Sequence, residues 1–556
     1  MTTDPATEGV AGRLALVLHA HLPFVRHPEH PFFLEEDWLY EALTETYLPL
    51  LGMLHDIEQE GVPWRLAITL SPTLLNMLED ELLRKRYEER LASLSALAER
   101  ECKRTRAMPA ERLVAEHYRA EIRRVRGTWE RLEGRVARGF AELARGGSLE
   151  ILTCAATHGY LPLLRVTPEA VRAQIAVGVA EHQRILGRAP EGIWLPECGY
   201  FEGLDRLLAR FGLRYFLTDA HGVLHARPRP RFGTAAPVVC PASGVAAFGR
   251  DRETAKQVWS KDEGYPGDPV YREFYRDIGY DLDIEYIGPW VQPDGRRKNT
   301  GFKYHRITGQ GEDKAPYDPE VARARAEVHA ENFVVNRERQ VEHLGETLGQ
   351  APIIVAPYDA ELFGHWWYEG PWWLSQVIRK TAERARSFGL THPSEFLRLH
   401  PRQQVAQPAE SSWGDQGYHG FWLDDANAWI YPHLHRASER MVELAMRFPI
   451  AEGLQARALR QAARELLLAQ SSDWAFILKS GTVVDYARER TRSHLRRFTR
   501  LYQDLVSDAL DERWVGQVEA LDNLFPTLDH RVYARRAPAA AVAAPMKGAE
   551  PDDPGS

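Results

Sequence analysis

The 556-residue chain has little cysteine and no excess of basic residues. Its four cysteines (Cys102, Cys154, Cys198 and Cys240) are scattered and form no CxxC pair, which argues against a disulfide framework or a cysteine zinc site and favours a reducing cytoplasm. Lys and Arg number 70 against 78 Asp and Glu, a formal net charge of -8, and no basic block compensates. Because phosphate neutralisation dominates nucleic-acid affinity, we expect no nucleic-acid partner.

Long apolar runs are also missing. No stretch approaches the ~18 consecutive apolar residues that a membrane span requires, so we expect no membrane partner. The first residues, MTTDPATEGVAG, contain acids and no basic segment followed by an apolar one, so we expect no secretory signal and a cytoplasmic location. Residues 1–12 and the Ala- and Pro-rich residues 534–556 are expected to be disordered.

Aromatic residues, by contrast, are plentiful. The chain has 15 Trp, 21 Tyr and 20 Phe, together 10% of its residues, and many of the tryptophans stand in polar, glycine-rich surroundings. Exposed aromatic rings present a flat apolar face that stacks on sugar rings. The aromatic content therefore indicates carbohydrate as a ligand class.

Short apolar runs alternate with longer helical patterns, which predicts parallel strands joined by crossover helices. Most of these runs are followed at once by His, Asp or Glu beside Gly or Pro, and barrel enzymes carry their catalytic residues at such strand ends. The runs are Leu14–Leu18, Trp64–Leu70, Leu149–Cys154, Gly192–Leu195 and Pro352–Ala356.

A charged stretch over residues 79–146 carries apolar residues at three- and four-residue spacing. We interpret it as a helical insertion packed on the barrel, with a partner-binding or coiled-coil helix as the alternative. The apolar stripe, taken as one helix, consists of Ile122, Val125, Trp129, Leu132, Val136, Phe140 and Leu143. Helical patterns return after about residue 430, at Met441–Phe448, Leu454–Gln470 and Tyr486–Val506.

Two strand-end carboxylates stand among aromatic residues: Glu197 in GIWLPECGY and Asp359 in APYDAELFGHWWYEG. Such a pair suits glycosidic bond chemistry, in which one carboxylate is the nucleophile and the other, with a raised pKa, protonates the leaving oxygen. A separation of ~5–5.5 Å would indicate retention of configuration. Capping of a following helix is the alternative for each residue, and composition alone does not separate the two interpretations.

His19 and His21 alternate along a strand, so both rings lie on one face. Such a pair can bind zinc, with His158 or Asp219 completing the site, or it can hydrogen-bond sugar hydroxyls. Because no HExxH, CxxC or carboxylate-rich motif accompanies the pair, we expect no metal.

Five motifs in this order resemble those of glycoside hydrolase family 57, and within it the 1,4-α-glucan branching enzymes: HAHLPFVRHPEHPFFLEEDWLYEAL, THGYLPLL, GIWLPECGY, APYDAELFGHWWYEG and WGDQGYHGFWLD. The resemblance covers about residues 13–533 and includes QVWSKDEGYPGD, KAPYDPE and LLLAQSSDWAF. It implies an α/β fold with an incomplete (β/α)7 barrel over residues 13–78 and 147–400, a helical insertion over 79–146, and a C-terminal α-helical domain over 401–533 that completes the substrate cleft. It also implies retaining chemistry without a metal or another cofactor.

The resemblance implies that Glu197 is the nucleophile and Asp359 the general acid/base. It further implies a donor subsite lined by His19, His21 and His158, and substrate contacts from Arg250, Gly267, Trp413 and Asp473. Weaker candidates for stacking platforms are Trp259, Trp290 and Trp422, with core packing as the alternative for the last two.

The sequence departs from the branching enzymes in one loop. Those enzymes carry a mobile loop, after the strand that here ends at Thr218, whose tyrosine favours transfer over hydrolysis. This chain has the shorter HARPRPRFGTAAP, with Phe232 in the tyrosine's place. A phenylalanine excludes water but donates no hydrogen bond, so Phe232 is expected as a lid residue while the ratio of transfer to hydrolysis stays open.

The expected activity is that of a retaining transglycosylase, which cleaves an α-1,4-glucan and transfers the chain to a 6-hydroxyl to form α-1,6 branches in glycogen or a related polysaccharide. A family 57 α-amylase or 4-α-glucanotransferase is the alternative, since it shares the first step and differs in the acceptor. A non-catalytic glycogen-binding module and a metal-dependent deacetylase or mannosidase are further alternatives. The expected partner is an α-glucan polysaccharide, and the expected assembly is a monomer or a homodimer.

Overall fold

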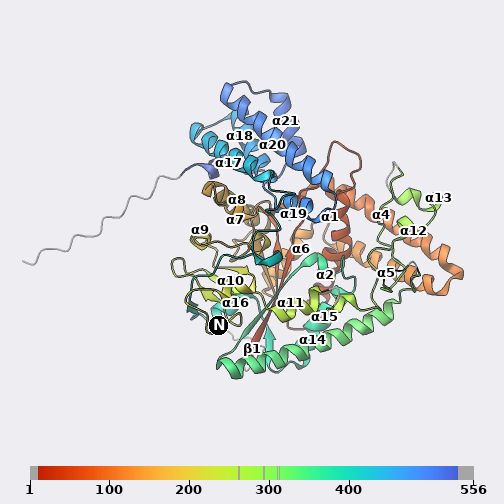
Figure 1. Cartoon of the computed structure of the whole chain (residues 1–556). Coiled ribbons are helices and arrows are strands. Elements are labelled where there is room, and N and C mark those ends of the chain that lie inside the picture. Colours follow the sequence, from red (N-terminus) through yellow and green to blue (C-terminus); the bar gives the residue numbers. More distant parts are fainter. Residues whose placement is uncertain (1–10, 261–262, 292–294, 310, 312, 536–556) are drawn as a thin grey trace, which may run out of the picture.

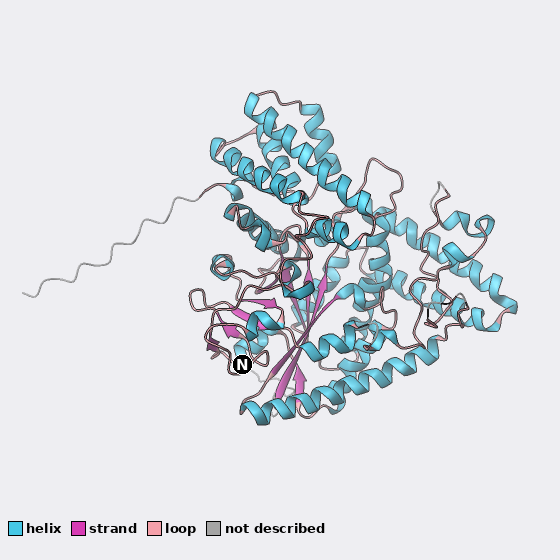
Figure 2. Ribbon diagram, viewed as in Figure 1, coloured by secondary structure: helices cyan, strands magenta, loops and turns pink. Residues whose placement is uncertain are grey.

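The computed structural model describes residues 11–260, 263–291, 295–309, 311 and 313–535. Within them, seven parallel strands form the centre of the molecule, and their short apolar sequences are almost entirely buried because helices cover the sheet. Figure 2 shows these strands surrounded by helices. In spatial order they are β7 (Ala246–Gly249), β5 (Tyr215–Thr218), β4 (Gly192–Trp194), β3 (Leu149–Cys154), β2 (Leu66–Leu70), β1 (Gly12–Ala20) and β8 (Ile353–Asp359).

The sheet curls far enough for its two ends to meet. Asp251, just after β7, donates its backbone N–H to Val355 of β8 at 2.8 Å, and Ile353 donates to Ala235 at 2.8 Å. These isolated bonds replace a strand ladder, so the barrel is incomplete, and the predicted (β/α)7 class is confirmed. Three short strands extend the sheet: β6 (Val238–Val239), antiparallel to β7; β10 (Gln404–Val405), beside β6; and β9 (Phe388–Leu390), beside β1.

Helices pack around this barrel, with the long α14 along one side (Figure 1). The helices that connect the barrel strands or cover the barrel are α1 (Glu36–Ala42), α2 (Leu48–Gln59), α3 (Pro72–Glu79), α7 (Leu161–Leu164), α8 (Pro168–Leu186), α9 (Leu204–Arg210), α10 (Ala220–Leu224), α11 (Arg252–Trp259), α14 (Pro319–Leu348), α15 (Gly370–Arg384) and α16 (Pro393–Leu399). Between α1 and α2 the chain forms a π-helical turn, η2 (Leu43–Tyr47).

The insertion consists of α4 (Glu81–Arg104), α5 (Pro109–Arg131) and α6 (Val136–Gly146). The prediction of one helix along the stripe from Ile122 to Leu143 is wrong, because Glu133 and Gly134 adopt φ of 52° and 69° and end α5. The stripe residues are nevertheless all buried, since both helices turn their apolar faces to the same core.

A segment that the sequence placed in the barrel lies on the insertion instead. It contains α12 (Ile278–Asp281) and α13 (Ile284–Ile287), which lie beside α4 and α5 in Figure 1. Tyr304 and Tyr286 both donate hydrogen bonds to the buried carboxylate of Glu101 on α4, at 2.8 and 2.7 Å. Long-range polar contacts of this kind leave no periodic signal in the sequence.

The C-terminal helices form a separate layer, blue in Figure 1: α17 (Ile430–Arg447), α18 (Gly453–Ala469), α19 (Ser472–Ser480), α20 (Val484–Ser507) and α21 (Glu512–Leu521). Residues 401–429, predicted to belong to the helical domain, instead contain β10 and an irregular segment, so the helices begin at Ile430. The prediction that residues 1–12 are disordered is wrong at Gly12, because this residue is the first of β1. Residues 1–10 and 536–556 of the predicted disordered ends lie outside the described residues.

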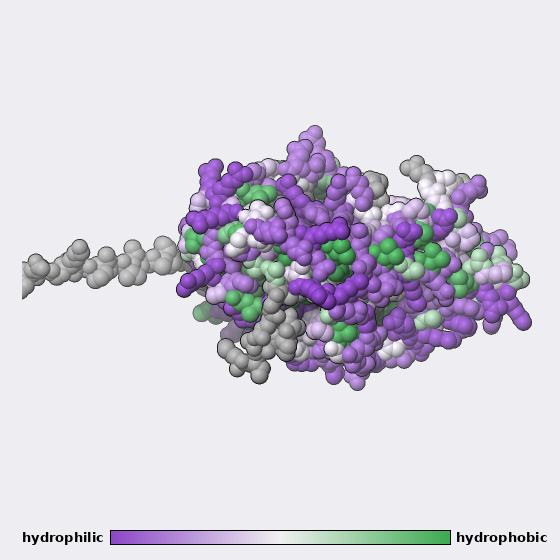
Figure 3. Space-filling view, turned by 90° about the horizontal axis from the view of Figure 1, so that it is seen from below, coloured by the Kyte–Doolittle hydropathy of each residue, from purple (hydrophilic) through white to green (hydrophobic). Residues whose placement is uncertain are grey.

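The surface seen in Figure 3 is mostly hydrophilic, with hydrophobic residues in small separate groups. Within the described part of the chain, none of the helices combines the length and apolarity needed to span a bilayer.

Candidate active site

Segments far apart in the sequence meet at the carboxyl ends of the barrel strands. His19, the last residue but one of β1, lies in register with Asp359 at the end of β8. Glu197 follows β4 in the short turn η4 (Pro196–Cys198), and Asp473 comes from the first turn of α19 in the C-terminal layer. The parallel direction of the strands places their functional ends at one edge, as predicted.

Glu197 is held in an unusual backbone conformation. Its φ of 59° and that of Cys198, 51°, lie in the left-handed region, which costs free energy for residues other than glycine. Both carboxylate oxygens accept hydrogen bonds, Oε2 from the indole Nε1 of Trp413 at 2.8 Å and Oε1 from the hydroxyl of Ser472 at 3.0 Å. Burial raises the pKa of Glu197, and these two bonds act in the opposite direction by stabilising the ionised form.

Asp359 is also buried at this edge, where two other carboxyl groups, Glu361 and Glu197, act on it. Burial raises the pKa of Asp359 well above its ordinary value, and the neighbouring charges of Glu361 and Glu197 raise it further, whereas Arg250 opposes the shift. This shift favours the protonated form, which a general acid requires. Both pKa values are thus raised, that of Asp359 more strongly, and the two hydrogen bonds to Glu197 favour its ionised form.

Glu361 is a third carboxyl group at the same edge. Its Oε1 accepts a hydrogen bond from the phenol of Tyr47 in η2 and another, at 3.3 Å, from the backbone N–H of His21. Burial raises the pKa of Glu361 to about 7. Glu361 is thus the alternative proton donor on the loop that follows β8.

The three predicted histidines form one stacked group behind Glu197. The rings of His21 and His158 lie 4.0 Å apart, and Nε2 of His158 lies 3.0 Å from Nε2 of His19. His158 Nδ1 lies 2.8 Å from Oγ of Ser472, the hydroxyl that donates to Glu197. The histidines therefore hold the group that orients the carboxylate.

His21, His158 and Asp473 place ligand atoms within 4.8 Å of one another, close enough to hold a metal ion. Both ring nitrogens of His21 already have partners, Ser71 at 2.8 Å and Asp473 at 3.1 Å, and so do those of His158. Burial would raise the pKa of Asp473, but His21 lowers it to about 2. These side chains form a closed hydrogen-bonded set. Asp219, the other ligand considered, pairs with Arg250.

Aromatic and cationic groups line a pocket of about 500 Å³ next to Glu197. The guanidinium of Arg250 lies 5.9 Å from the ring centre of Trp413, and the ring of Trp259 meets Trp413 edge to face at 6.5 Å. The pocket walls include Asp219, His221, Arg250, Trp413, Gln416 and Tyr418. The structure thus brings Arg250, Trp413 and Trp259 together beside the nucleophile candidate.

Other predicted residues lie elsewhere. Trp422 is 1% exposed, and its ring stacks on Tyr160 at 4.4 Å. Of the two interpretations of this residue, the structure therefore supports core packing and contradicts a stacking platform for sugar. Trp290 donates its indole N–H to Ser93 on α4 at 3.0 Å, so it packs on the insertion instead of the catalytic cluster. Gly267 ends a short turn, η5 (Tyr265–Gly267), in which Tyr265 stacks on His329 of α14.

Phe232 is half-buried in the loop before β6. The backbone N–H of its neighbour Arg231 donates to Gln404 of β10 at 2.8 Å, and the carbonyl of Phe232 accepts from Ala235 at 2.9 Å. These bonds tie the loop to the edge of the sheet. The lid role of Phe232 stays a prediction.

Sequence reasoning missed three hydroxyl groups that complete the site: Ser71, Tyr47 and Ser472. Ser472 was within reach, because it stands in the quoted motif LLLAQSSDWAF beside Asp473. Ser71 directly follows β2, at a strand end like the catalytic candidates. Tyr47 lies in a helical segment whose apolar spacing indicates only a buried packing face.

Comparisons with known proteins place the chain among carbohydrate-active enzymes. The family model described as glycosyl hydrolase family 57 matches residues 15–408, and the one described as 1,4-alpha-glucan branching enzyme, C-terminal, matches residues 433–533. The 1,4-alpha-glucan branching enzyme TK1436 of Thermococcus kodakarensis is 36% identical over 552 residues, covering 92% of this chain and 77% of the relative.

Solved structures resemble the whole chain. The alpha-amylase AmyC from Thermotoga maritima is 44% identical with a TM-score of 0.89, covering 95% of this chain and 100% of its own. The family 57 branching enzyme from Pyrococcus horikoshii is 34% identical with a TM-score of 0.85, covering 95% of this chain and 98% of its own.

Proposed function

The chain belongs to glycosyl hydrolase family 57, and from this membership we propose that it is a retaining 1,4-α-glucan branching transglycosylase. One observation carries the proposal: the region matched by the branching-enzyme C-terminal model supplies part of the site. Ser472 of that region donates a hydrogen bond to Glu197, and Asp473 accepts one from His21.

In the first step, Asp359 donates its proton to the glycosidic oxygen while a carboxylate oxygen of Glu197 attacks the anomeric carbon. The glycosidic bond breaks, the leaving chain departs with its new hydroxyl, and a glycosyl ester forms on Glu197. The Trp413 and Ser472 hydrogen bonds keep the carboxylate aimed and ionised.

In the second step, the Asp359 carboxylate takes the proton from the 6-hydroxyl of an acceptor glucan. The acceptor oxygen attacks the anomeric carbon, the ester bond to Glu197 breaks, and an α-1,6 linkage results. Two inversions retain the α configuration. The donor chain is proposed to lie over Trp413, Trp259 and Arg250, with His19, His21, His158 and Asp473 at its innermost sugar.

Hydrolysis is a second candidate activity, with water in place of the 6-hydroxyl. Two observations favour it: the 44% identity to an alpha-amylase, and phenylalanine at position 232 where the branching enzymes carry a tyrosine. A 4-α-glucanotransferase would use a 4-hydroxyl in the same step.

Product analysis separates these activities. The enzyme is incubated with linear amylose, and new reducing ends are counted before and after complete debranching of the product. We expect few new ends before debranching and many afterwards, together with a lowered iodine absorbance. Shortened linear chains that give no extra ends on debranching would overturn the proposal in favour of hydrolysis, and resized linear chains would favour 4-α-transfer.

We further propose a cytoplasmic role in the biosynthesis of glycogen or a related α-glucan. Four unpaired cysteines, three of them buried, support a reducing compartment.

A further inference from the structure

A stacked aromatic surface is formed by Trp366, on the loop that follows Asp359, and by Phe274 and Tyr275, on the segment between η5 and α12. The rings of Trp366 and Phe274 stack at 4.5 Å with an angle of 20° between their planes, and Lys303 lies 4.2 Å from the centre of Phe274. Trp366 is 56% exposed, so the face turned away from Phe274 is open to solvent. Tyr275 meets Phe274 edge to face and is 80% exposed. We call these three rings the aromatic platform.

His365 anchors two rings of the platform, Trp366 and Phe274. His365 packs edge-on against both Trp366 and Phe274, at 5.3 and 5.4 Å. Its Nδ1 lies 2.7 Å from a carboxylate oxygen of Glu45, and the other oxygen of Glu45 accepts from Arg272 at 3.1 Å. Large exposed rings are usually mobile, and fixing them in advance lowers the entropy cost of binding a partner.

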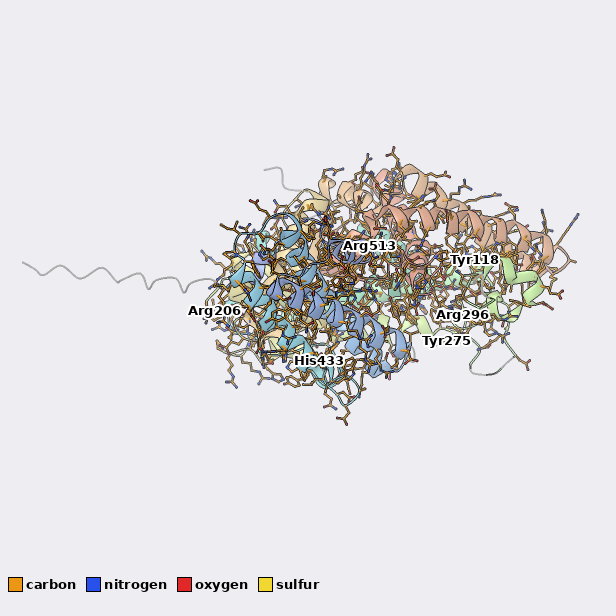
Figure 4. All side chains as sticks on the ribbon, turned by 90° about the horizontal axis from the view of Figure 1, so that it is seen from above. Tyr118, Arg206, Tyr275, Arg296, His433 and Arg513 are labelled. Carbon is orange, nitrogen blue, oxygen red and sulfur yellow. The ribbon has the colours of Figure 1, made fainter. Side chains whose placement is uncertain are left out.

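Hydrogen bonds link Trp366 of the platform to Glu361 of the candidate active site. The backbone N–H of Trp366 donates to the carbonyl of Glu361 at 3.1 Å, and the Glu361 side chain accepts from the backbone of His21 at 3.3 Å. Tyr47, two residues after Glu45 in η2, donates to the same carboxylate. Figure 4 shows Tyr275 in the same half of the molecule as Tyr118 of the insertion.

The position of Trp366 on the loop after Asp359 indicates which glucan chain the platform contacts. Asp359 protonates the leaving oxygen and later deprotonates the acceptor hydroxyl, so residues of its loop face the leaving and acceptor side of the scissile bond. The Trp413 pocket stands instead beside Glu197, which holds the donor chain. From this geometry we propose that Trp366, Phe274 and Tyr275 bind the acceptor α-glucan chain, an inference that rests on the proposed transferase function.

The test measures transfer from an activated aryl maltooligoside donor to maltoheptaose as acceptor. Trp366→Ala removes the open ring face, and we expect it to raise the acceptor concentration for half-maximal transfer about five- to tenfold. Release of the aryl group at zero acceptor should stay within twofold, and hydrolysis should rise relative to transfer. Trp366→Phe keeps a flat ring and should restore most of the acceptor affinity.

Tyr502 of α20, whose ring lies beneath Arg440, is far from the platform in the sequence and serves as the control. Tyr502→Ala should leave the acceptor dependence unchanged. Thermal unfolding of each variant reports whether folding is intact. If wild type transfers but Trp366→Ala has an unchanged acceptor dependence, or loses aryl release in parallel, the platform proposal is wrong. If wild type itself only hydrolyses the donor, the proposed function fails instead.

Discussion

At the scale of single residues, the site rests on two carboxyl groups with different surroundings. Glu197 accepts hydrogen bonds on both oxygens, which favours the ionised form. Asp359 lies among buried groups and next to two other carboxyl groups, which favours the protonated form. These surroundings agree with the proposed roles of Glu197 as nucleophile and Asp359 as acid.

Replacing the nucleophile tests the first assignment. Glu197→Gln keeps nearly the same shape but cannot form the glycosyl ester, so double displacement loses its first step. We expect a loss of at least about a thousandfold in turnover of both natural and activated substrates, which corresponds to ~4 kcal/mol. Circular dichroism should show the fold intact. Turnover within about tenfold of wild type would contradict the assignment.

Replacing the acid should produce a different defect. Good leaving groups need little protonation, so Asp359→Asn should still cleave an activated aryl glycoside and accumulate the glycosyl-enzyme, whereas cleavage of amylose falls by about 10²–10⁴-fold. Mass spectrometry of the trapped enzyme detects the intermediate. Equal losses for both substrates would move the proton donor to Glu361.

Glu361 has a pKa raised by burial to about 7, above the ordinary 4.5 of a glutamate. The folded state therefore binds this proton more tightly than the unfolded state, and the associated stability is lost as pH rises from about 4.5 through about 7. Glu361→Gln removes the titration, and its amide oxygen can still accept from Tyr47. Urea unfolding should show wild type losing about 2–3 kcal/mol relative to the variant between pH 5 and pH 8. A pH-independent difference would contradict the assigned pKa.

At the scale of elements, the turn after β8 is shaped by its contact with the π-helical turn η2. Gly364 has a φ of 112° and its N–H donates to Trp367 at 2.8 Å. A Cβ at Gly364 would lie 1.8 Å from the carbonyl oxygen of Glu45. Only glycine lets the two turns approach this closely, and the approach sets both Glu361 and the aromatic platform.

Gly364→Ala should therefore destabilise the protein and disturb the site. We expect a loss of more than about 2 kcal/mol from the backbone clash and the positive φ together. Gly349→Ala is the matched control, because its φ is 66° but nothing lies within 4 Å of the added Cβ. The control should lose only about 1 kcal/mol and keep full activity. Similar losses of stability and activity in both variants, measured by thermal unfolding and amylose turnover, would rule out the clash.

At the scale of the whole molecule, the barrel and the C-terminal helices share one hydrophobic core. Leu16 of β1 and Ile68 of β2 belong to the same buried cluster as Leu466 of α18 and Phe498 of α20. The active site also spans both layers, through Ser472 and Glu197. The two layers are therefore expected to unfold together.

Leu466→Ala tests this coupling. Removing the buried side chain should cost about 2–5 kcal/mol, and it should lower the midpoints of heat inactivation and of far-UV circular dichroism by the same amount. Two separate transitions, with only the first shifted, would show that the C-terminal helices fold independently.

The strand ends could be predicted because each is encoded locally. The run Leu149–Cys154 matches β3 residue for residue, and the run Gly192–Leu195 matches β4 to within one residue. The break between α5 and α6 could not be predicted from the apolar pattern, because the apolar spacing continues across Gly134. Trp422 was ambiguous for a related reason: a motif identifies a tryptophan but not which of its faces is covered.

The sequence by itself determined the parallel barrel class, the carboxylates at its strand ends and the family, since apolar runs and contiguous motifs are properties of neighbouring residues. Only the tertiary structure decided which side chains meet. The Ser472 hydroxyl reaches Glu197 across 275 residues, and His21 reaches Asp473 across 452. Burial, and with it the raised pKa values of Asp359 and Glu361, arises only when these distant segments exclude water from one another.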